Sequence, residues 1–268
     1  MLLKISGLSR STYYYNMKIC DKDEKNKDIL VAIKEVFTAS REIYGYRRIT
    51  AVLNNKGIKA NHKKVLRIMN RLCLRPQSKK IKKYNSYKGT VGKVAPNLIK
   101  RNFEAEKPNL KWYTDITEFK TEKGKIYLSP ILDGFNSEII SYSLSTSPNI
   151  PQIQEMLNRA FRDKKDLSNL IFHSDQGWQY QQQFYQKELK DRNITQSMSR
   201  KGTCLDNGLM ENFFGRLKVE MYYGHEKSFT TTSELMKKVA DYIDFYNNDR
   251  IKLKLNGLSP VDFRNQSA

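Results

Sequence analysis

A change of texture after residue 108 constrains the fold of this 268-residue chain most strongly. Three successive segments rich in β-branched and aromatic residues come first and are separated by turns, at 110–120, 125–134 and 138–146. Helical and strand-like segments then alternate, at 150–163, 169–177, 181–193, 194–199 and from about 206 onward. This order predicts a mixed sheet with helices on both faces. Pro130 lacks an N–H donor, so the second strand is predicted to lie at an edge or to contain a bulge.

The basic residues are concentrated in the first part of the chain. Residues 1–107 contain 26 Lys and Arg against 8 Asp and Glu, whereas residues 108–268 contain 22 against 20. Such segregation favours a polyanion-binding region, with a solvated basic surface as the alternative. Nucleic acid fits better than a membrane, because the basic residues are spread over helical periodicity and no apolar anchor adjoins them.

Residues 1–75 are predicted to form a helical, helix-turn-helix-like DNA-binding region. Three helices are expected, with these apolar residues inward: Ile29, Ile33, Val36, Phe37; Ile49, Val52, Leu53; and Val65, Leu66, Met69, Leu72. The second follows Gly45 and the third begins after Asn61, a capping residue. The predicted DNA contacts are the outward basic residues Arg47, Arg48, Lys63, Lys64, Arg67 and Arg71. Residues 76–107 are interpreted as a basic linker that either follows a nucleic-acid backbone or serves only as a tether.

The three cysteines are far apart in the sequence, so neither a disulfide framework nor a zinc finger is predicted. No apolar run has the length of a membrane span, and the first residues lack the pattern of a secretory signal. We therefore expect a cytoplasmic, nucleoid-associated protein without a membrane partner.

Three carboxylates stand at positions that such a sheet can bring together. Asp115 lies in YTDIT, where alternation along one continuous strand places it with Tyr113 and Thr117; Asp175 ends the strand LIFHSD. Glu211 borders the apolar stripe of a helix whose inward residues are Met210, Phe213, Phe214, Leu217 and Met221. Three carboxylates in one cleft would repel each other unless cations lay between them, and a pair of Mg²⁺ ions would satisfy them. Taken singly, each acid is also explained as a strand, turn or solvated helix residue.

The neighbourhoods of these acids carry a resemblance. WYTDITEF, HSDQGWQY and SMSRKGTCLDNGLMENFFGRLKVE resemble the signature blocks of the DDE transposases of bacterial insertion sequences with a retroviral-integrase-like core. The 35 residues between Asp175 and Glu211 agree with that group. REIYGYRRITAVLNNKGIKANHKKVLRIMNRL looks like its helix-turn-helix segment, and FYNNDRIKLKLNGLSPVDFR like its C-terminal block. The resemblance implies an RNase H-like mixed five-stranded sheet flanked by helices, with the integrase catalytic core at 108–225 and a C-terminal helix and tail at 226–268.

The resemblance also implies a chemistry. Asp115, Asp175 and Glu211 would bind two Mg²⁺, with Mn²⁺ as a substitute; water would cleave the element's DNA end, and the freed 3′-OH would attack recipient DNA. Lys218, seven residues after Glu211, would contact DNA, and no zinc is expected. The implied partners are element ends, target DNA, further copies of the chain on DNA, and an upstream-frame polypeptide or its frameshift fusion. The chain would be the second-frame product of the two-frame, copy-out-paste-in group.

Some readings stay open at this point. His173 is either a ligand-orienting group or a hydrogen-bonded strand-end histidine; Asp133 is read as a turn residue, and Asp206 with Asn207 as a helix start. The alternative functions are a catalytically silent DNA-binding regulator of transposition and an RNase H-like nuclease without strand transfer.

Overall fold

The computed structural model describes residues 9–14, 27–76, 94–162 and 166–267. The chain divides into two compact units, Met1–Gln77 and Ser78–Ala268. Each has a hydrophobic core of its own. The two units are therefore described separately.

The first unit contains the three predicted helices, α3 (Lys27–Ala39), α4 (Tyr46–Asn55) and α5 (His62–Arg71). The Asn61 side chain caps α5 by accepting a hydrogen bond from the backbone N–H of Lys63, at 2.8 Å. The core of this unit is apolar and comes from all three helices: Ile33, Val36, Phe37, Ile49, Leu53, Val65, Ile68 and Met69. The prediction that Leu66 faces inward was wrong, because Ile68 completes the buried stripe with Val65 and Met69 while Leu66 is 37% exposed.

The second unit is built on one mixed sheet. Its described strands are β1 (Lys111–Thr114), β2 (Thr117–Thr121), β3 (Gly124–Asp133), β4 (Ile139–Ser145), β5 (Ile171–Ser174) and β6 (Thr195–Met198). β1 and β2 pair antiparallel with consecutive parts of β3, so they are two pieces of one interrupted strand. β4 pairs antiparallel with β3, while β5 and β6 run parallel to β1. The predicted mixed sheet is confirmed, with six described strands in place of five because the first is interrupted.

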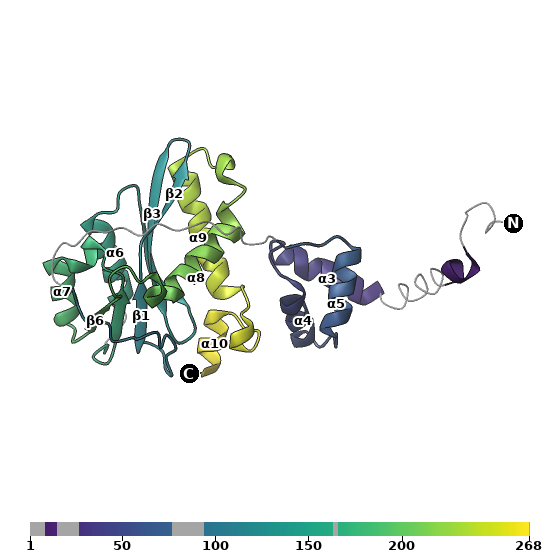
Figure 1. The fold of residues 1–268 in the computed structure, drawn as a ribbon, viewed down its shortest axis with the longest axis horizontal. Coiled ribbons are helices and arrows are strands. Elements are labelled where there is room, and N and C mark those ends of the chain that lie inside the picture. The colour runs from purple at the N-terminus through teal and green to yellow at the C-terminus, as the bar shows by residue number, and fades with distance from the viewer. Residues whose placement is uncertain (1–8, 15–26, 77–93, 163–165, 268) are drawn as a thin grey trace. The chain divides into compact units, whose positions relative to one another are not determined.

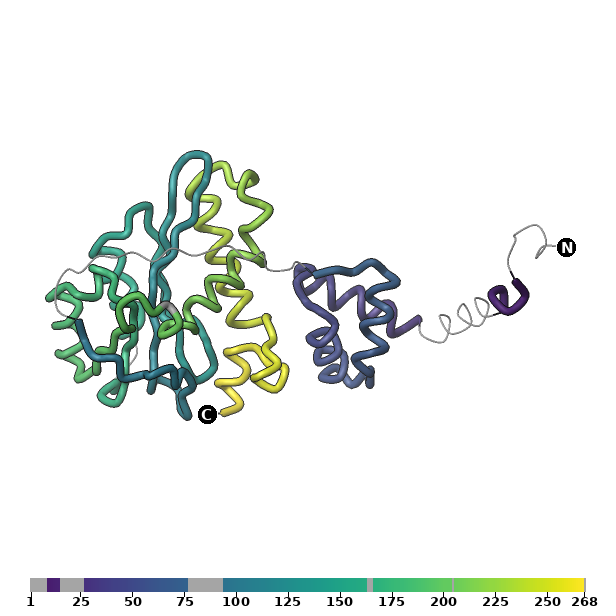
Figure 2. The backbone as a smooth tube through the Cα atoms, in the orientation of Figure 1, coloured from purple at the N-terminus to yellow at the C-terminus, as the bar shows by residue number. Residues whose placement is uncertain are grey.

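Helices cover both faces of this sheet (Figure 1). α6 (Ile150–Phe161) and α7 (Gln183–Lys190) pack on one core, where Trp112 of β1 stacks on Phe161 at 6.2 Å between ring centroids. α8 (Gly208–Leu217), α9 (Thr232–Asn248) and α10 (Pro260–Ser267) follow along the chain, in green to yellow in Figure 2. The rings of Phe213 on α8 and Tyr246 on α9 are in contact, with 4.9 Å between their centroids. The helix and tail expected at 226–268 thus belong to the second unit.

The helix that carries Glu211 is not uniform. α8 ends at Leu217, and a π-helical turn continues from Lys218 to Tyr222. This wider turn shifts the helical register, so Val219 and Tyr222 are buried and Met221, predicted to be inward, is only partly buried. The other four residues of the predicted stripe are buried as expected: Met210, Phe213, Phe214 and Leu217.

Pro130 does not lie on an edge strand, because β3 has neighbours on both sides. It pairs with Tyr142 of β4 next to a register shift at Ile131/Leu132, and the interruption between β1 and β2 lies along its other side. The missing N–H donor therefore falls where the ladder is already irregular.

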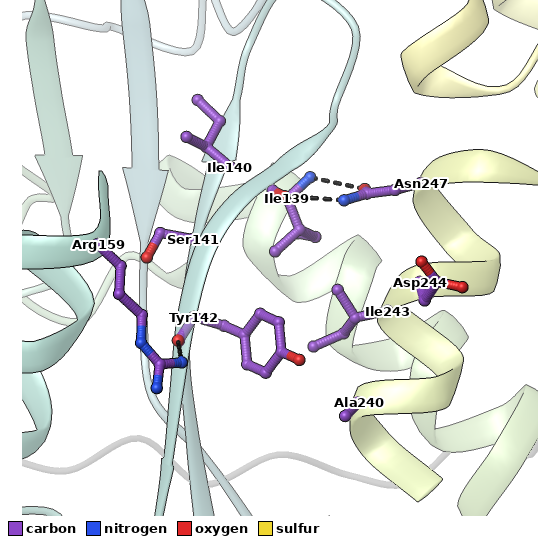
Figure 3. Close-up of a pocket in the computed structure, with 9 residues that line it drawn as sticks. All are labelled: Ile139, Ile140, Ser141, Tyr142, Arg159, Ala240, Ile243, Asp244 and Asn247. Atoms are coloured by element: carbon purple, nitrogen blue, oxygen red, sulfur yellow. Dashed lines mark hydrogen bonds between the residues drawn. The ribbon is translucent and has the colours of Figure 1, made fainter. Parts of the chain in front are cut away.

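β4 pairs with β3 alone among the described strands, so its outer edge needs other partners. The amide of Asn247 on α9 supplies them at Ile139: it accepts from the backbone N–H at 2.9 Å and donates to the carbonyl oxygen at 2.8 Å (Figure 3). Arg159 of α6 donates to the carbonyl oxygen of Tyr142 at 3.0 Å. A pocket between β4 and α9 is lined by these residues and by Asp244.

The predicted linker divides into two parts. Its basic and tyrosine-rich stretch, 77–93, lies outside the described residues. From residue 94 the chain is bound to the second unit: the backbone N–H of Ala95 donates to the sulfur of Met198 at 3.4 Å, and that of Leu98 to Ser197 Oγ at 3.0 Å. In the described part of the chain, no helix combines the length and apolar composition needed to cross a bilayer.

Candidate functional site

The register of two neighbouring parallel strands brings Asp115 close to Asp175. β1 and β5 pair with Tyr113 opposite His173, and each aspartate lies two residues later, directly after the last residue of its strand. The carboxyl ends of parallel strands meet at one edge of a sheet, where functional side chains commonly converge. The two sequence-predicted aspartates therefore emerge side by side.

Each aspartate is oriented by the chain that follows it. Asp115 Oδ1 accepts a hydrogen bond from the N–H of Ile116 at 2.7 Å, and Asp175 Oδ1 accepts one from the N–H of Gly177 at 2.8 Å. The first bond lies within the interruption between β1 and β2, so the alternation assumed for a continuous strand does not extend through Asp115. Both side chains are partly buried.

A third link joins the helix of Glu211 to the same strand end. Asn207 immediately precedes α8 and donates from Nδ2 to the carbonyl oxygen of Thr114 at 3.2 Å. Glu211 lies in the first turn of that helix and is partly buried. Lys218 begins the π-helical turn, with its ammonium 5.2 Å from the centroid of the Phe119 ring. α8 thus starts beside Thr114, the neighbour of Asp115.

The electrostatics of Asp115 reflect all these neighbours. Burial, followed by the negative charge of Asp175 and then that of Glu211, raises the pKa of the Asp115 carboxyl well above its ordinary value. The N–H of Ile116 and the ammonium of Lys218 act in the opposite direction. Burial also raises the pKa of Asp175. Asp175, Glu211 and Lys218 therefore all lie within electrostatic range of Asp115.

The donor set suits a hard divalent cation, because carboxylate oxygens are its preferred ligands and their mutual repulsion would be relieved by it. Among the described residues, however, no three acidic, histidine or cysteine side chains are already arranged to enclose a metal ion. The effect of Asp175 and Glu211 on the pKa of Asp115 acts over a longer range than a metal–oxygen bond. The described residues therefore supply carboxylate donors suited to a metal ion, but these donors are not at coordinating distances from a common point.

Two polar residues near the site have structural partners. His173 is buried, with Nδ1 2.9 Å from Ser197 Oγ and Nε2 3.1 Å from Ser199 Oγ. The buried Asp206 carboxylate accepts from the Arg200 guanidinium at 2.8 and 2.9 Å and from Arg101 at 3.1 Å, and these bonds lower its pKa. The hydrogen-bonded interpretation of His173 is confirmed. Asp206 holds the turn Cys204–Asn207 before α8.

Asp133 likewise belongs to the framework. Its carboxylate accepts from the backbone N–H of Phe135 and of Asn109, both at 3.0 Å, and from the Arg264 guanidinium at 2.7 Å. The turn role predicted for it is confirmed by the bond to Phe135, and the ion pair to Arg264 ties this turn to α10.

Three residues of the site were missed by sequence reasoning. The hydroxyl of the buried Tyr180 lies 3.5 Å from Thr114 Oγ1, and burial followed by the charges of Asp115 and Asp175 raises its pKa. Asn207 had been interpreted only as a helix-start residue. Gly177 leaves room for a carboxylate, since a Cβ there would lie 2.9 Å from Asp175 Oδ1. The Asp-Gln-Gly sequence was a usable signal for the glycine, whereas Tyr180 and Asn207 carry none.

Replacing Gly177 by Ala is expected to lower the free energy of unfolding by about 1–3 kcal/mol, because the added methyl group overlaps a fixed carboxylate. Urea unfolding measures this. Gly208→Ala is the matched control, since a Cβ there meets only the Phe103 ring at 3.6 Å. Equal stability of the two variants would contradict the close approach.

The buried imidazole of His173 is expected to make stability depend on pH. Burial lowers its pKa from 6.5 to about 4, so the unfolded chain binds this proton first. Its contribution is fully present above about pH 6.5 and is lost as the pH falls toward about 4. The advantage of the natural chain over His173→Gln in unfolding free energy should shrink by about 3 kcal/mol across that range. Urea titrations at several pH values measure it, and a constant difference would exclude a buried neutral imidazole.

The predicted DNA contacts of the first unit lie on α4 and α5. Arg47, Lys63, Arg67 and Arg71 are exposed, whereas Arg48 and Lys64 are partly buried. Arg47 donates from Nε to the Tyr46 hydroxyl at 3.2 Å, and the Arg48 guanidinium lies 5.6 Å from the centroid of the Tyr44 ring. Two of the six cations are thus held against tyrosines.

Comparison with known proteins agrees with both units. Integrase core domain models match residues 105–204 and 211–268, and an HTH-like domain model matches residues 23–82. The InsK protein of insertion sequence element IS150 in Escherichia coli K12 is 47% identical over 99% of this chain and 93% of that protein. The transposase InsF of insertion sequence IS3A in the same organism is 35% identical over 99% and 93%. The HTLV-2 integrase catalytic core, solved with magnesium, is 18% identical over 60% of this chain and 99% of that one, with a TM-score of 0.47.

Proposed function

Because the chain belongs to the IS3 family of insertion-sequence transposases, we propose that its integrase core cleaves the DNA ends of the element and transfers them to target DNA in a metal-dependent reaction. The observation that carries the proposal is that Asp115 and Asp175 follow the ends of adjacent parallel strands, while Asn207 ties the start of α8, which carries Glu211, to Thr114. Carboxylates held close together repel each other and lower the stability of the fold, so such clusters occur mainly at functional sites. A regulator that only binds DNA would not require these carboxylates.

Asp115, Asp175 and Glu211 are the residues that would hold the metal. Two Mg²⁺, or Mn²⁺ in their place, would activate the attacking oxygen and stabilise the leaving oxygen of a phosphodiester. Asp115 and Asp175 are kept in place by the N–H groups of Ile116 and Gly177. We assign Lys218 to a phosphate of the bound DNA beside the carboxylates. Its partly buried side chain follows Glu211 by two helical turns, and an ammonium is a compact charge that can bind a phosphate oxygen.

The remaining parts of the proposal concern partners. Arg47, Arg48, Lys63, Lys64, Arg67 and Arg71 would bind the phosphates of the element ends through the first unit. Two ends must be joined to one target, so several copies of the chain would assemble on DNA. An upstream-frame polypeptide, or its frameshift fusion, would complete the assembly. The substrate places the reaction at the nucleoid in the cytoplasm.

The test uses the full-length chain, a duplex carrying the terminal repeat that flanks its gene, a supercoiled target plasmid and Mg²⁺. Joined products on a denaturing gel are expected, with the upstream-frame polypeptide added in a parallel series. Cleavage without joining would instead indicate a nuclease. DNA binding without any Mg²⁺-dependent product in either series would leave only a regulatory role.

A further inference from the structure

The two helices of the first unit that follow α3 carry no acidic residue. Residues 43–76 contain nine Lys and Arg and no Asp or Glu, whereas the acids of residues 27–42 all precede α4, at Asp28, Glu35 and Glu42. A turn joins α4 to α5, with Gly57 at a φ of 80° and the N–H of Ala60 bound to Asn54 Oδ1 at 2.9 Å. This surface suits a polyanion, and a short turn between two packed helices is the arrangement that presents the second helix to a DNA groove.

The outward side chains of α5 sort into columns along the helix. One column, spaced by four residues, is uncharged: His62, Leu66 and Asn70. The cations lie on one side of this column: Lys63, Arg67 and Arg71 are again spaced by four residues, and Lys64 lies beyond them. The buried stripe of Val65, Ile68 and Met69 lies on the other side of the column. The uncharged column is therefore placed between the buried stripe and the exposed cations.

Leu66 distinguishes this surface from a simple phosphate-binding helix. Its side chain is 37% exposed although a neighbouring leucine-sized position, Ile68, is 5% exposed. The apolar side chain of Leu66 gains no favourable contact from phosphate oxygens, whereas the methyl group of thymine in the major groove is an apolar partner for it. A carboxamide such as Asn70, one turn later, is the group that pairs with both the donor and the acceptor of adenine. Phosphate binding alone explains the cations but leaves this column without a use.

The N-terminal end of the column adjoins a phosphate-binding side chain. His62 lies 6.3 Å from Tyr46 between ring centroids, and Tyr46 holds the Nε of Arg47 through its hydroxyl at 3.2 Å. In helix-turn-helix proteins the first helix contacts the backbone while the N-terminal part of the second reaches base edges. His62 and Arg47 stand at this junction.

We propose that the uncharged column His62, Leu66 and Asn70 reads base edges in the major groove of duplex DNA, with Leu66 against a thymine methyl group and Asn70 on an adenine. The neighbouring cations of α5 hold a phosphate backbone beside the groove. The inference rests on the proposed function only in taking DNA as the partner, and it assigns the choice of DNA sequence to three side chains of α5.

The test is a selection from a random duplex library of about 20 base pairs, read by sequencing, with the full-length chain and without divalent metal. The natural chain is expected to enrich a motif that contains A·T pairs. Leu66→Ala and Asn70→Ala should each lose about tenfold or more of the preference at one position while keeping affinity for unselected DNA. Arg67→Ala should keep the motif but weaken binding to all sequences, with a salt slope lower by about 1. Val31→Ala on α3, 49% exposed, is the matched apolar control and should change nothing.

The proposal is overturned if the natural chain enriches no motif, or if both Leu66→Ala and Asn70→Ala enrich the same motif as the natural chain. Thermal unfolding checks that each variant is folded. The selection involves no chemistry, so it separates the two proposals. A chain that selects a motif but joins no DNA refutes only the proposed reaction, whereas joining with unchanged motifs in both variants refutes only the base reading.

Discussion

Replacing Asp115 by Asn is expected to reduce Mg²⁺-dependent DNA cleavage and joining by about 10³-fold or more, while DNA binding stays within about twofold. A metal site supplies several kcal/mol of transition-state stabilisation, and each ~1.4 kcal/mol corresponds to a factor of ten in rate. Asn cannot supply the negative charge, although its shape is nearly the same. DNA binding is retained because the cationic surface of the first unit is untouched.

Stability provides a second measurement on the same variant. Burial and the charges of Asp175 and Glu211 oppose the ionised form of Asp115, so without metal Asp115→Asn should unfold at the same temperature as the natural chain or higher. Added Mg²⁺ should raise the unfolding temperature of the natural chain more than that of the variant. Asp191→Asn, an exposed aspartate after α7, is the control. Unchanged joining by Asp115→Asn would remove it from the metal ligands.

Replacing Arg250 by Met is expected to lower the free energy of unfolding by about 3–5 kcal/mol. Arg250 follows α9, and its side chain is 1% exposed; it donates from Nε and Nη2 to the Glu220 carboxylate at 2.8 and 2.5 Å. The Tyr242 hydroxyl donates to the same carboxylate at 2.7 Å. Without Arg250, the carboxylate of Glu220, itself 10% exposed, would keep its charge in a buried place without its main partner.

Urea unfolding with two further variants tests the buried ion pair. Lys254→Met removes the partner of Glu104 in a pair with side chains 89% and 86% exposed, so its effect should stay below about 1 kcal/mol. Adding Glu220→Gln to Arg250→Met should restore part of the lost stability, because no buried charge then remains. An Arg250→Met effect as small as that of Lys254→Met would show that the pair is screened by water. The pair matters for the site, since Glu220 lies in the π-helical turn that begins at Lys218.

The parts predicted well are those that depend on local periodicity. The three helices of the first unit and the strands and helices of the second followed from apolar spacing and turn residues, because each element buries one face and that face must repeat at its own period. The errors share a different cause. Leu66 was placed inward, Met221 was placed on the stripe, and the first strand was taken as continuous. In each case the backbone or the packing departs from the ideal period: the π-helical turn moves Met221 off the stripe, and the interruption after Thr114 breaks the alternation of the strand.

The amino-acid sequence by itself indicated a mixed sheet flanked by helices and a basic helical first unit, because periodicity and composition carry these features; the resemblance of its motifs then singled out the three acids. Only the tertiary structure decided that Asp115 and Asp175 leave adjacent parallel strands in register, and that Asn207 fixes the start of α8 beside them. It also decided that Leu66 remains in solvent among cations. The physical reason is the same throughout: spacing along a chain sets which faces can be buried, whereas distances between charges depend on which of those faces pack together.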